Sequence, residues 1–286
     1  MDYIQKRGLT KAIVTKFGIG FAPNSWNALV DAMRKKGYTD KELRDADLVG
    51  EKNGRIYDRF RNRVMFPIID LRGNVIAFGG RIMTDEKPKY LNSSDTPVFK
   101  KSENLFSLNN AKNSGSRALL LCEGYMDVIA VNQAGFQNAV ATLGTALTTE
   151  QAVLMKRYAD EVIICYDADE AGQKATSRAI PILRGAGLPG RVLTIPNGKD
   201  PDEFIKSQGA DGPEAFRAII EKSGELYVFA KFFLPAEKID EAIQRDGVPY
   251  NIMIQRGLLQ LSGDNYVDYH DCFNWFVELI ERYHIY

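Results

Sequence analysis

The sequence predicts an α/β fold in three parts: a basic, mixed α+β N-terminal part, a central parallel sheet with flanking helices, and a C-terminal helical segment. The central sheet is indicated by residues 118–222, where short apolar stretches alternate with longer stretches of helical spacing. Such alternation is typical of a parallel sheet covered by helices on both faces. Residues 1–117 differ from the rest by their charge, and residues 223–286 by their aromatic content. We therefore expect domain boundaries at these positions.

Short helices are expected in the first 50 residues. Thr10 can cap a helix that runs towards Phe17, because a threonine hydroxyl accepts hydrogen bonds from the free N–H groups of a first turn. Ser25 can cap a second helix that Gly37 would end, and Thr39 can cap a third. The three caps predict helices separated by short loops.

Residues 51–117 favour strands and loops. Residues 63–70 and 75–78 are strand-like apolar stretches, and residues 72–74 (Arg-Gly-Asn) between them suit a turn. This pattern predicts a β-hairpin. Residues 87–101 are polar, and we expect them to form a loop.

Four strands alternate with three helices in the central part. The expected strands are 118–122, 138–142, 161–167 and 191–195. The expected helices are 126–134, 149–158 and 170–184. Because each helix returns the chain to the starting edge, the strands should run parallel.

Composition excludes several classes of protein. The 286 residues are 45% hydrophobic and 26% charged, which is ordinary for a globular protein. No apolar run approaches the ~20 residues needed to cross a bilayer, and the polar N-terminus does not resemble a signal peptide. We therefore expect a cytoplasmic protein without a membrane partner. Cys122, Cys165 and Cys272 lie far apart and there are 2 histidines, so we expect no zinc in this chain.

The charge is distributed unevenly along the chain. Residues 1–117 contain 22 Lys and Arg against 13 Asp and Glu, a net charge of +9, and the remainder has a net charge of −9. This asymmetry suits a polyanion-binding surface beside a cation site. A chance imbalance between solvated faces explains the same counts, since counts do not show clustering.

Acidic residues follow three of the expected strands. Glu123 ends the first strand, Asp167 and Asp169 end the third, and Asp200 and Asp202 follow the fourth. Ligands of open α/β sheets bind beyond the carboxyl ends of the strands, so these acids should share one edge. Crowded carboxylates repel one another unless cations lie between them, and hard oxygen ligands suit Mg²⁺ or Mn²⁺. Two or more ions of this kind would support phosphoryl chemistry.

Each acid also has a structural interpretation. Asp169 can be the N-cap of the following helix, and Asp200 and Asp202 can be turn residues around Pro201. Asp127 lies one turn into a helix, where it can face the same cleft or can simply interact with the helix N-terminus. The shared edge favours the metal-site hypothesis over these separate explanations.

A set of ordered motifs resembles a known family. The chain is similar to the Toprim module of bacterial replicative DNA primases, and upstream to the RNA-polymerase domain of the same family. The resemblance covers residues 1 to about 222. Its Toprim motifs are Glu123-Gly-Tyr-Met-Asp127, Leu143-Gly-Thr, Tyr166-Asp-Ala-Asp-Glu-Ala-Gly172 and Lys199-Asp-Pro-Asp202. Its upstream motifs include Tyr57-Asp-Arg-Phe-Arg61, Arg63-Val-Met-Phe-Pro67, Phe78-Gly-Gly-Arg81 and Lys89-Tyr-Leu-Asn-Ser93.

The resemblance implies a primase catalytic core that joins NTPs into short RNA on single-stranded DNA. It implies that Glu123 is the acid–base residue or a metal ligand near the priming 3′-hydroxyl, and that Asp167 and Asp169 bind the catalytic ions. It further implies that three acids help to hold the metal and the triphosphate: Asp127, Asp200 and Asp202.

The resemblance also implies a basic surface for template DNA, nucleotide phosphates and the RNA–DNA hybrid product. Lys and Arg neutralise phosphates without reading sequence, and Asn can donate to a base or a phosphate. Taken singly, a lysine or arginine is more often a solvated surface charge than a phosphate ligand. The implied set comprises Arg81, Lys89, Asn92 and Lys101, with Arg59, Arg61 and Arg7 as weaker members.

The chain departs from the family pattern at both ends. The zinc-binding module of the family is not recognisable here, and neither is the module that binds the replicative helicase. Beyond Ser223 the family pattern is not followed clearly, and the aromatic residues there are expected to serve packing. Initiation at a specific sequence and coupling to a helicase are therefore not expected from these residues.

Three other classes of function remain open. A phosphohydrolase of the haloacid-dehalogenase type would use Asp167 as a phosphorylated nucleophile, but would leave Glu123 and the basic part without a role. Another Toprim enzyme, a nuclease or topoisomerase, would use the same acids. A non-catalytic DNA-binding subunit would have no use for clustered carboxylates.

Overall fold

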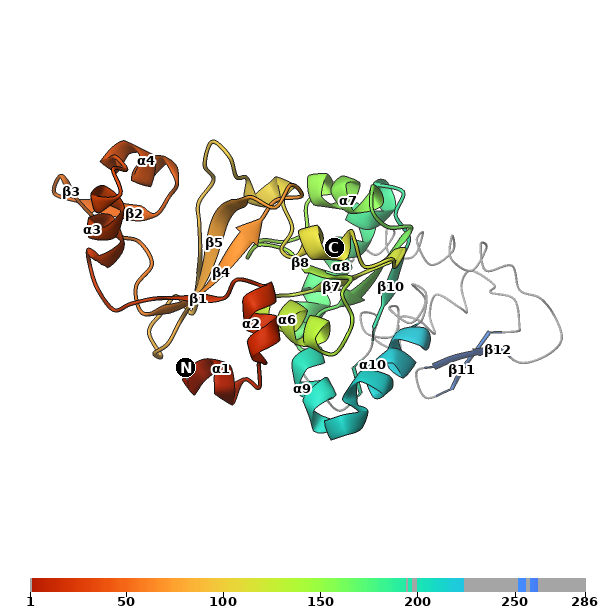
Figure 1. The fold of residues 1–286 in the computed structure, drawn as a ribbon. Coiled ribbons are helices and arrows are strands. Elements are labelled where there is room, and N and C mark those ends of the chain that lie inside the picture. The colour runs from red at the N-terminus through yellow and green to blue at the C-terminus, as the bar shows by residue number, and fades with distance from the viewer. Residues whose placement is uncertain (1, 194, 197–199, 224–251, 256–257, 262–286) are drawn as a thin grey trace.

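The structure is a computed structural model that describes residues 2–193, 195–196, 200–223, 252–255 and 258–261. An N-terminal antiparallel sheet and a central parallel sheet lie side by side, and a small lobe projects from the N-terminal sheet (Figure 1). No helix within these ranges is both long and apolar enough to cross a membrane.

The N-terminal sheet is antiparallel, in the order β1-β4-β5-β6. It consists of β1 (Gly20–Ala22), β4 (Arg63–Ile69), β5 (Val75–Ile82) and β6 (Tyr90–Asn92). The expected hairpin is confirmed as β4 and β5. The expected loop at 87–101 is wrong at β6, because Tyr90–Asn92 pairs with β5 along the edge of the sheet.

Local capping explains two of the four short N-terminal helices described in residues 2–50. After α1 (Asp2–Lys6), the hydroxyl of Thr10 accepts from the Ile13 N–H at 3.3 Å and starts α2 (Lys11–Lys16). Thr39 and Glu42 form a reciprocal capping box at the start of α4 (Asp40–Asp45). Both predicted caps are confirmed.

The predicted cap at Ser25 is wrong. Helix α3 (Ala28–Lys35) begins after Asn27, whose side chain makes no capping bond. The carboxylate of Asp58 accepts from the N–H groups of Leu29 and Val30 at 2.7 and 3.0 Å. The first turn is therefore capped from a distant strand, which explains why local sequence did not locate the start of this helix.

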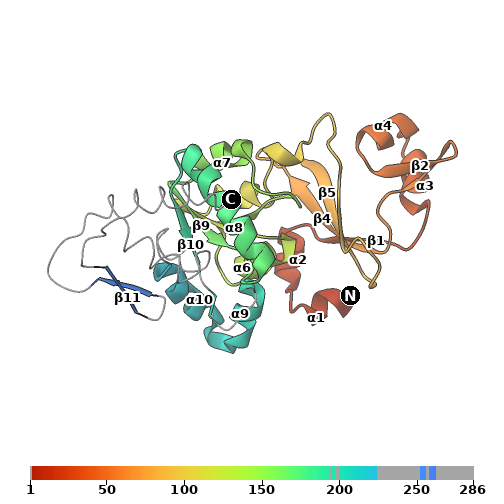
Figure 2. The ribbon, with the colours of Figure 1, turned by 180° about the vertical axis from the view of Figure 1, so that it is seen from behind.

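A small lobe has its own core. It is formed by α3, α4, β2 (Val49–Lys52) and β3 (Arg55–Asp58), with the two strands paired antiparallel. Its buried side chains are Val30, Leu43, Val49 and Ile56. Figures 1 and 2 show it at the end of the molecule remote from the central sheet.

The central sheet is parallel throughout and has the order β10-β9-β7-β8. Its strands are β7 (Ala118–Cys122), β8 (Ala139–Ala141), β9 (Glu161–Cys165) and β10 (Gly190–Val192). The expected order of alternating strands and helices is confirmed, although β9 ends two residues and β10 three residues earlier than predicted.

Helices cover both faces of this sheet (Figures 1 and 2). On one face α6 (Tyr125–Gln133) packs with α9 (Pro201–Ser207), which in turn contacts α10 (Gly212–Glu221). On the other face lie α7 (Thr149–Lys156) and α8 (Glu170–Gly185). The connecting elements are α5 (Leu108–Ala111) and the 3₁₀ turns η1 (Lys101–Glu103) and η2 (Gly209–Asp211).

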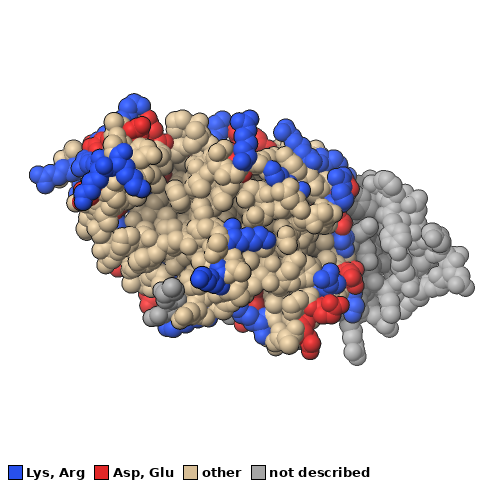
Figure 3. Space-filling view, viewed as in Figure 1, with Lys and Arg blue, Asp and Glu red and all other residues tan. Residues whose placement is uncertain are grey.

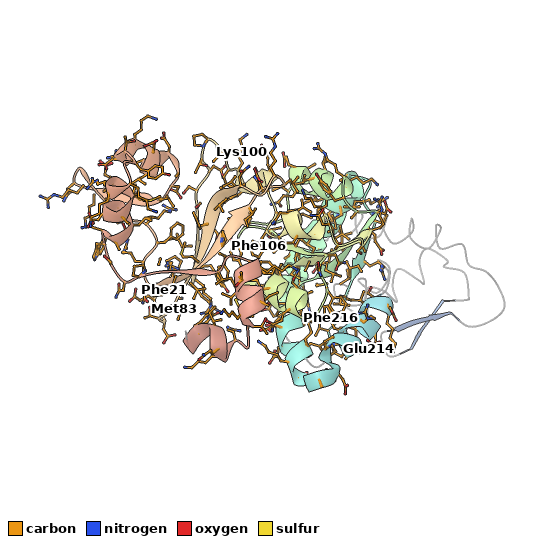
Figure 4. All side chains as sticks on the ribbon, in the orientation of Figure 1. Phe21, Met83, Lys100, Phe106, Glu214 and Phe216 are labelled. Carbon is orange, nitrogen blue, oxygen red and sulfur yellow. The ribbon has the colours of Figure 1, made fainter. Side chains whose placement is uncertain are left out.

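One hydrophobic core joins the two sheets. Phe66 of β4 stacks on Tyr125 of α6 with ring centres 5.1 Å apart, and Phe106 meets the edge of the same tyrosine at 4.7 Å. Figure 4 shows Phe106 between the N-terminal and central sheets. The core therefore continues across residues 117 and 118, and the boundary placed there stays a prediction.

The C-terminal prediction is wrong at eight residues. The segments β11 (Ile252–Gln255) and β12 (Leu258–Leu261) are antiparallel strands. Two β-branched isoleucines in β11 favour this conformation over a helix. The remaining part of the predicted helical segment, including its aromatic residues Phe229, Phe232, Phe233, Trp275 and Phe276, lies outside the described residues.

Candidate active site

Two acidic residues meet at the carboxyl edge of the central sheet. Glu123 follows β7 and Asp167 follows β9, and these strands are adjacent. An Oε1 atom of Glu123 accepts from the backbone N–H of Asp167 at 3.3 Å. Both side chains are half-buried. The sheet topology thus brings these two predicted residues together.

Gly172 lets the first turn of α8 approach both acids closely. A Cβ atom at this position would lie 2.1 Å from the carbonyl oxygen of Asp167 and 2.8 Å from Oε1 of Glu123. The Gly172 N–H also donates to Oδ1 of Asp169 at 2.9 Å, so Asp169 is the N-cap of α8. The capping interpretation of Asp169 is therefore correct, and its exposed carboxylate still lies at the same edge.

The second acidic group lies at the start of α6 and α9. Asp127 accepts from the Gly124 N–H at 3.1 Å, and Asp200 caps α9 by accepting from the Glu203 N–H at 2.7 Å. Asp202 lies in the first turn of α9 and is 5% exposed. Lys206 Nζ lies 2.7 Å from each of its oxygens, so Asp202 is already neutralised by a protein cation.

Burial and like charge raise the pKa values of these carboxyls. Burial raises the pKa of Asp167 to about 7, and repulsion from Glu123 and Asp200 adds to it. Burial likewise raises the pKa of Asp127 to about 7, with repulsion from Asp167 and Asp200. The pKa of Glu123 is raised by burial first and then by Asp169 and Asp200. The acids therefore share one electrostatic field in which negative charge is under-compensated.

The donor set fits a hard divalent cation by its chemistry. Carboxylate oxygens are the ligands preferred by Mg²⁺ and Mn²⁺, and a cation would relieve the repulsion that adds to the effect of burial on the pKa values. In the positions observed, no three His, Cys, Asp or Glu side chains of the described residues are close enough to hold an ion. Rotamer adjustment of exposed Asp169 and half-buried Asp200 would be needed to complete a ligand set.

Cysteine chemistry contributes nothing at this edge. Cys122 and Cys165 are fully buried next to the site, and burial raises the pKa of each thiol. A thiol that stays protonated is a poor nucleophile and a poor ligand.

Three predicted cations face the acids or their surroundings. Lys89 is exposed, and its charge lowers the pKa of Asp167, against the larger effects that raise it. Arg7 lies 3.7 Å from Asp202. Arg81 covers the ring of Tyr3 at 4.5 Å, and its Nε is buried without a hydrogen-bond partner among the described residues.

Asn92 and Arg59 are engaged within the protein. The Asn92 amide donates to the Leu143 carbonyl at 2.8 Å and accepts from the Tyr125 hydroxyl at 2.8 Å. Arg59 lies 2.9 Å from a carboxylate oxygen of Asp47 and is three-quarters buried. Arg59 also donates to the Asn92 carbonyl at 3.4 Å. These contacts join β6 to the central sheet and to the small lobe, and a nucleic-acid role for either residue stays a prediction.

The last two predicted basic residues lie elsewhere. Arg61 stacks over the Trp26 ring at 4.0 Å and donates to the Asp58 carbonyl. Lys101 begins η1, where its N–H donates to Asp95 at 3.0 Å. In the view of Figure 3, Lys and Arg gather on the small lobe and over α7, while the middle of this face is mostly uncharged. The Lys and Arg side chains seen on that face do not form one continuous patch.

Two residues that position the site were missed from sequence. Arg63 is buried and donates to the carbonyls of Gly80 and Pro88 at 3.0 and 3.1 Å, which fixes the segment that carries Lys89. Tyr125 packs so closely that a Cβ on Gly79 would lie 2.4 Å from its ring. The glycine pair after Phe78 was the available signal, because adjacent glycines in a strand indicate a close neighbour.

Comparison with protein families identifies two matching models. A model described as the DNA primase catalytic core, N-terminal domain, matches residues 1–112. A Toprim-like model matches residues 120–205, which contain all six of the predicted acidic site residues.

Curated relatives are similar over most of this chain. A DNA primase of Clostridium acetobutylicum is 50% identical over 222 residues, which are 77% of this chain and 37% of that protein. A DNA primase of Pseudomonas aeruginosa is 44% identical over 248 residues, 83% of this chain and 37% of that protein. The chain therefore spans little more than a third of these relatives.

Solved structures agree in fold. A DnaG primase catalytic domain bound to single-stranded DNA is 38% identical with a TM-score of 0.74, over 85% of this chain and 80% of that chain. The zinc-binding and RNA polymerase domains of the Aquifex aeolicus primase are 37% identical with a TM-score of 0.75, over 99% of this chain and 66% of that chain.

Proposed function

Because the chain belongs to the bacterial DNA primase family and corresponds to its catalytic core, we propose that it synthesises short RNA primers from NTPs on single-stranded DNA. The observation that carries this proposal is the edge where Glu123 and Asp167 meet on adjacent strands under the first turn of α8. Family membership gives no support to the haloacid-dehalogenase alternative, in which Glu123 would have no role.

Mg²⁺ or Mn²⁺ would be held mainly by Asp167 and Asp169, with Glu123 beside them. Asp127, Asp200 and Asp202 would support the ions and the triphosphate. When bound, the ions would stabilise the negative charge that develops on the transferred phosphate and on pyrophosphate. Burial and repulsion raise the pKa values of Asp127 and Asp167, and a nearby cation would oppose both effects by stabilising the ionised carboxylates, which supports this assignment.

Glu123 would accept the proton of the attacking 3′-hydroxyl. Its half-buried carboxylate is fixed by the backbone N–H of Asp167, and the close approach of Gly172 limits its movement. A positioned base of this kind contributes typically 10²–10⁴-fold to rate.

The basic residues would hold nucleic acid and nucleotide in front of the acids. Lys89 is the strongest member, since its charge already acts on Asp167. Arg81 and Arg7 would extend this surface, and Arg61 and Lys101 would contact more distant phosphates. Asn92 and Arg59 would act by joining β6 to its neighbours. The bound partners would be single-stranded DNA, NTPs and the RNA–DNA hybrid, in the bacterial cytoplasm.

The test is RNA synthesis from labelled NTPs on single-stranded DNA, with Mg²⁺ or Mn²⁺. Wild type should form metal-dependent oligoribonucleotides, and Glu123→Ala and Asp167→Ala should not. Asp160→Asn is the matched control, because it removes an exposed carboxylate beside the opposite end of β9. Folded wild type that makes no RNA even on a pre-primed template would contradict the proposal.

A further inference from the structure

A cavity adjoins Glu123 on the side of the sheet away from Asp127. Its volume is about 460 Å³, and it lies between the loop after β8 and the first three turns of α8. Glu123 forms part of its wall, together with Thr145 and Leu147 of the loop and Ala175 of the helix. Asp127 belongs to α6, on the opposite face, so this cavity is separate from the acid cluster and shares one residue with it.

Two cations line the cavity one helical turn apart. Lys174 and Arg178 both project from α8 and are exposed. The structure shows no hydrogen bond or ion pair between Arg178 and any residue it describes. Lys174 pairs with Glu170, which is itself largely exposed, and such surface pairs contribute little and exchange readily. Like charges at this spacing repel, so an anion between them would be favourable.

The remaining wall suits a nucleotide base. Tyr166 and Leu147 are buried at the cavity, and Ala171 and Ala175 leave its helical side flat and apolar. The volume lies within the range of about 300–1,000 Å³ for small-molecule sites. An apolar wall with two cations at one end therefore matches the chemistry of a single nucleotide with its phosphate.

Charge decides how such a nucleotide would lie. Glu123 repels phosphate, so the phosphate must lie at the end with Lys174 and Arg178. A sugar hydroxyl then points to the carboxylate, which can accept its proton. This orientation suits a nucleotide that presents a hydroxyl to the acids, and opposes one that presents a triphosphate.

We propose that this cavity binds the 3′-terminal nucleotide of the growing RNA strand, with its phosphodiester on Lys174 and Arg178 and its 3′-hydroxyl facing Glu123. The role of the 3′-hydroxyl as the attacking group rests on the proposed function. The binding of the nucleotide rests on the cavity.

The test separates binding from synthesis. An RNA–DNA hybrid with a recessed, fluorescently labelled RNA strand is titrated with protein in the absence of NTPs. Lys174→Ala and Arg178→Ala should each weaken binding about 5- to 10-fold, and should each lower the slope of log Kd against log salt by about 1. Arg157→Ala is the matched control, because Arg157 is an exposed arginine at the C-cap of neighbouring α7 that does not line this cavity. It should leave both quantities unchanged.

Kinetics of hybrid extension distinguish a nucleotide at the end of the RNA strand from a free NTP as the occupant of the cavity. The variants should raise KM for the hybrid and leave KM for NTPs and the saturated kcat unchanged. Equal hybrid affinity in wild type and both variants would overturn the proposal, whether or not the chain makes RNA. A raised KM for NTPs with unchanged hybrid affinity would also overturn it and would assign the cavity to free nucleotide. If wild type makes no RNA but the two variants still bind the hybrid more weakly than wild type does, the proposed function is refuted and the binding role of the cavity stands.

Discussion

Gly172→Ala should inactivate the protein through one methyl group. The new Cβ would lie 2.1 Å from the Asp167 carbonyl oxygen and 2.8 Å from Oε1 of Glu123, whereas ordinary contacts begin at 3.4 Å. Relief of the first contact requires a displacement of more than 1 Å between α8 and the end of β9. A misplacement of about 1 Å at a reacting centre can cost about 100-fold in rate, or about 2.7 kcal/mol. Overpacking should also lower the free energy of unfolding by about 1–3 kcal/mol.

The same helix provides the control. Gly185 is the last residue of α8, and a Cβ there would have no neighbour within 4 Å. Gly185→Ala should therefore keep full activity and raise stability by about 0.5–1 kcal/mol, because alanine loses less backbone entropy than glycine.

Both variants are assayed by extension of an RNA primer on a DNA template, and by thermal unfolding. We expect at least a 100-fold loss of kcat/KM for Gly172→Ala and none for Gly185→Ala. Activity of Gly172→Ala within threefold of wild type, at an unchanged Tm, would refute the packing described for the acidic edge.

Three further predictions concern stability. Asp58→Ala removes the acceptor of two backbone N–H groups of α3 and should destabilise the small lobe by about 2–4 kcal/mol, seen as faster amide exchange in α3; unchanged protection would contradict this. The pKa of Asp127 is raised to about 7, above its ordinary value of about 4, so the metal-free protein should lose stability as pH rises from about 4 through about 7. Asp127→Asn should remove this loss of unfolding free energy, which reaches up to about 4 kcal/mol at pH 8 in EDTA. Equal pH profiles of Tm for wild type and the variant would disprove it. Tyr125→Phe deletes the hydrogen bond to Asn92 and should cost about 1 kcal/mol in urea unfolding, with an unaltered midpoint as the contrary result.

Local patterns were sufficient for much of the fold. Thr10 and Thr39 cap helices through contacts within three residues, and the alternating strands and helices of the central sheet follow from short apolar stretches. Elements that depend on distant partners were missed. The edge strand β6 has three residues and is held by β5, and the start of α3 is set by Asp58 from another strand.

The candidate site was predictable where topology determines it. Glu123 and Asp167 follow adjacent parallel strands, so their meeting at one edge required only the strand order. The surroundings were not predictable, because they depend on side-chain partners. Asparagine can hydrogen-bond a base or a phosphate, but the side-chain amide of Asn92 is hydrogen-bonded to Leu143 and Tyr125. Asp202 is paired with Lys206, one turn further along the same helix.

The most direct test of the central claim is single-turnover extension of an RNA primer on a DNA template in Mg²⁺. It compares wild type with Glu123→Gln and Asp167→Asn, which keep the size of each side chain and remove its charge, and with Asp160→Asn as control. We expect template-directed extension by wild type and the control, and a loss of at least about 1,000-fold in both site variants. Extension by Asp167→Asn at the wild-type rate would show that the acidic edge is not where the chemistry takes place.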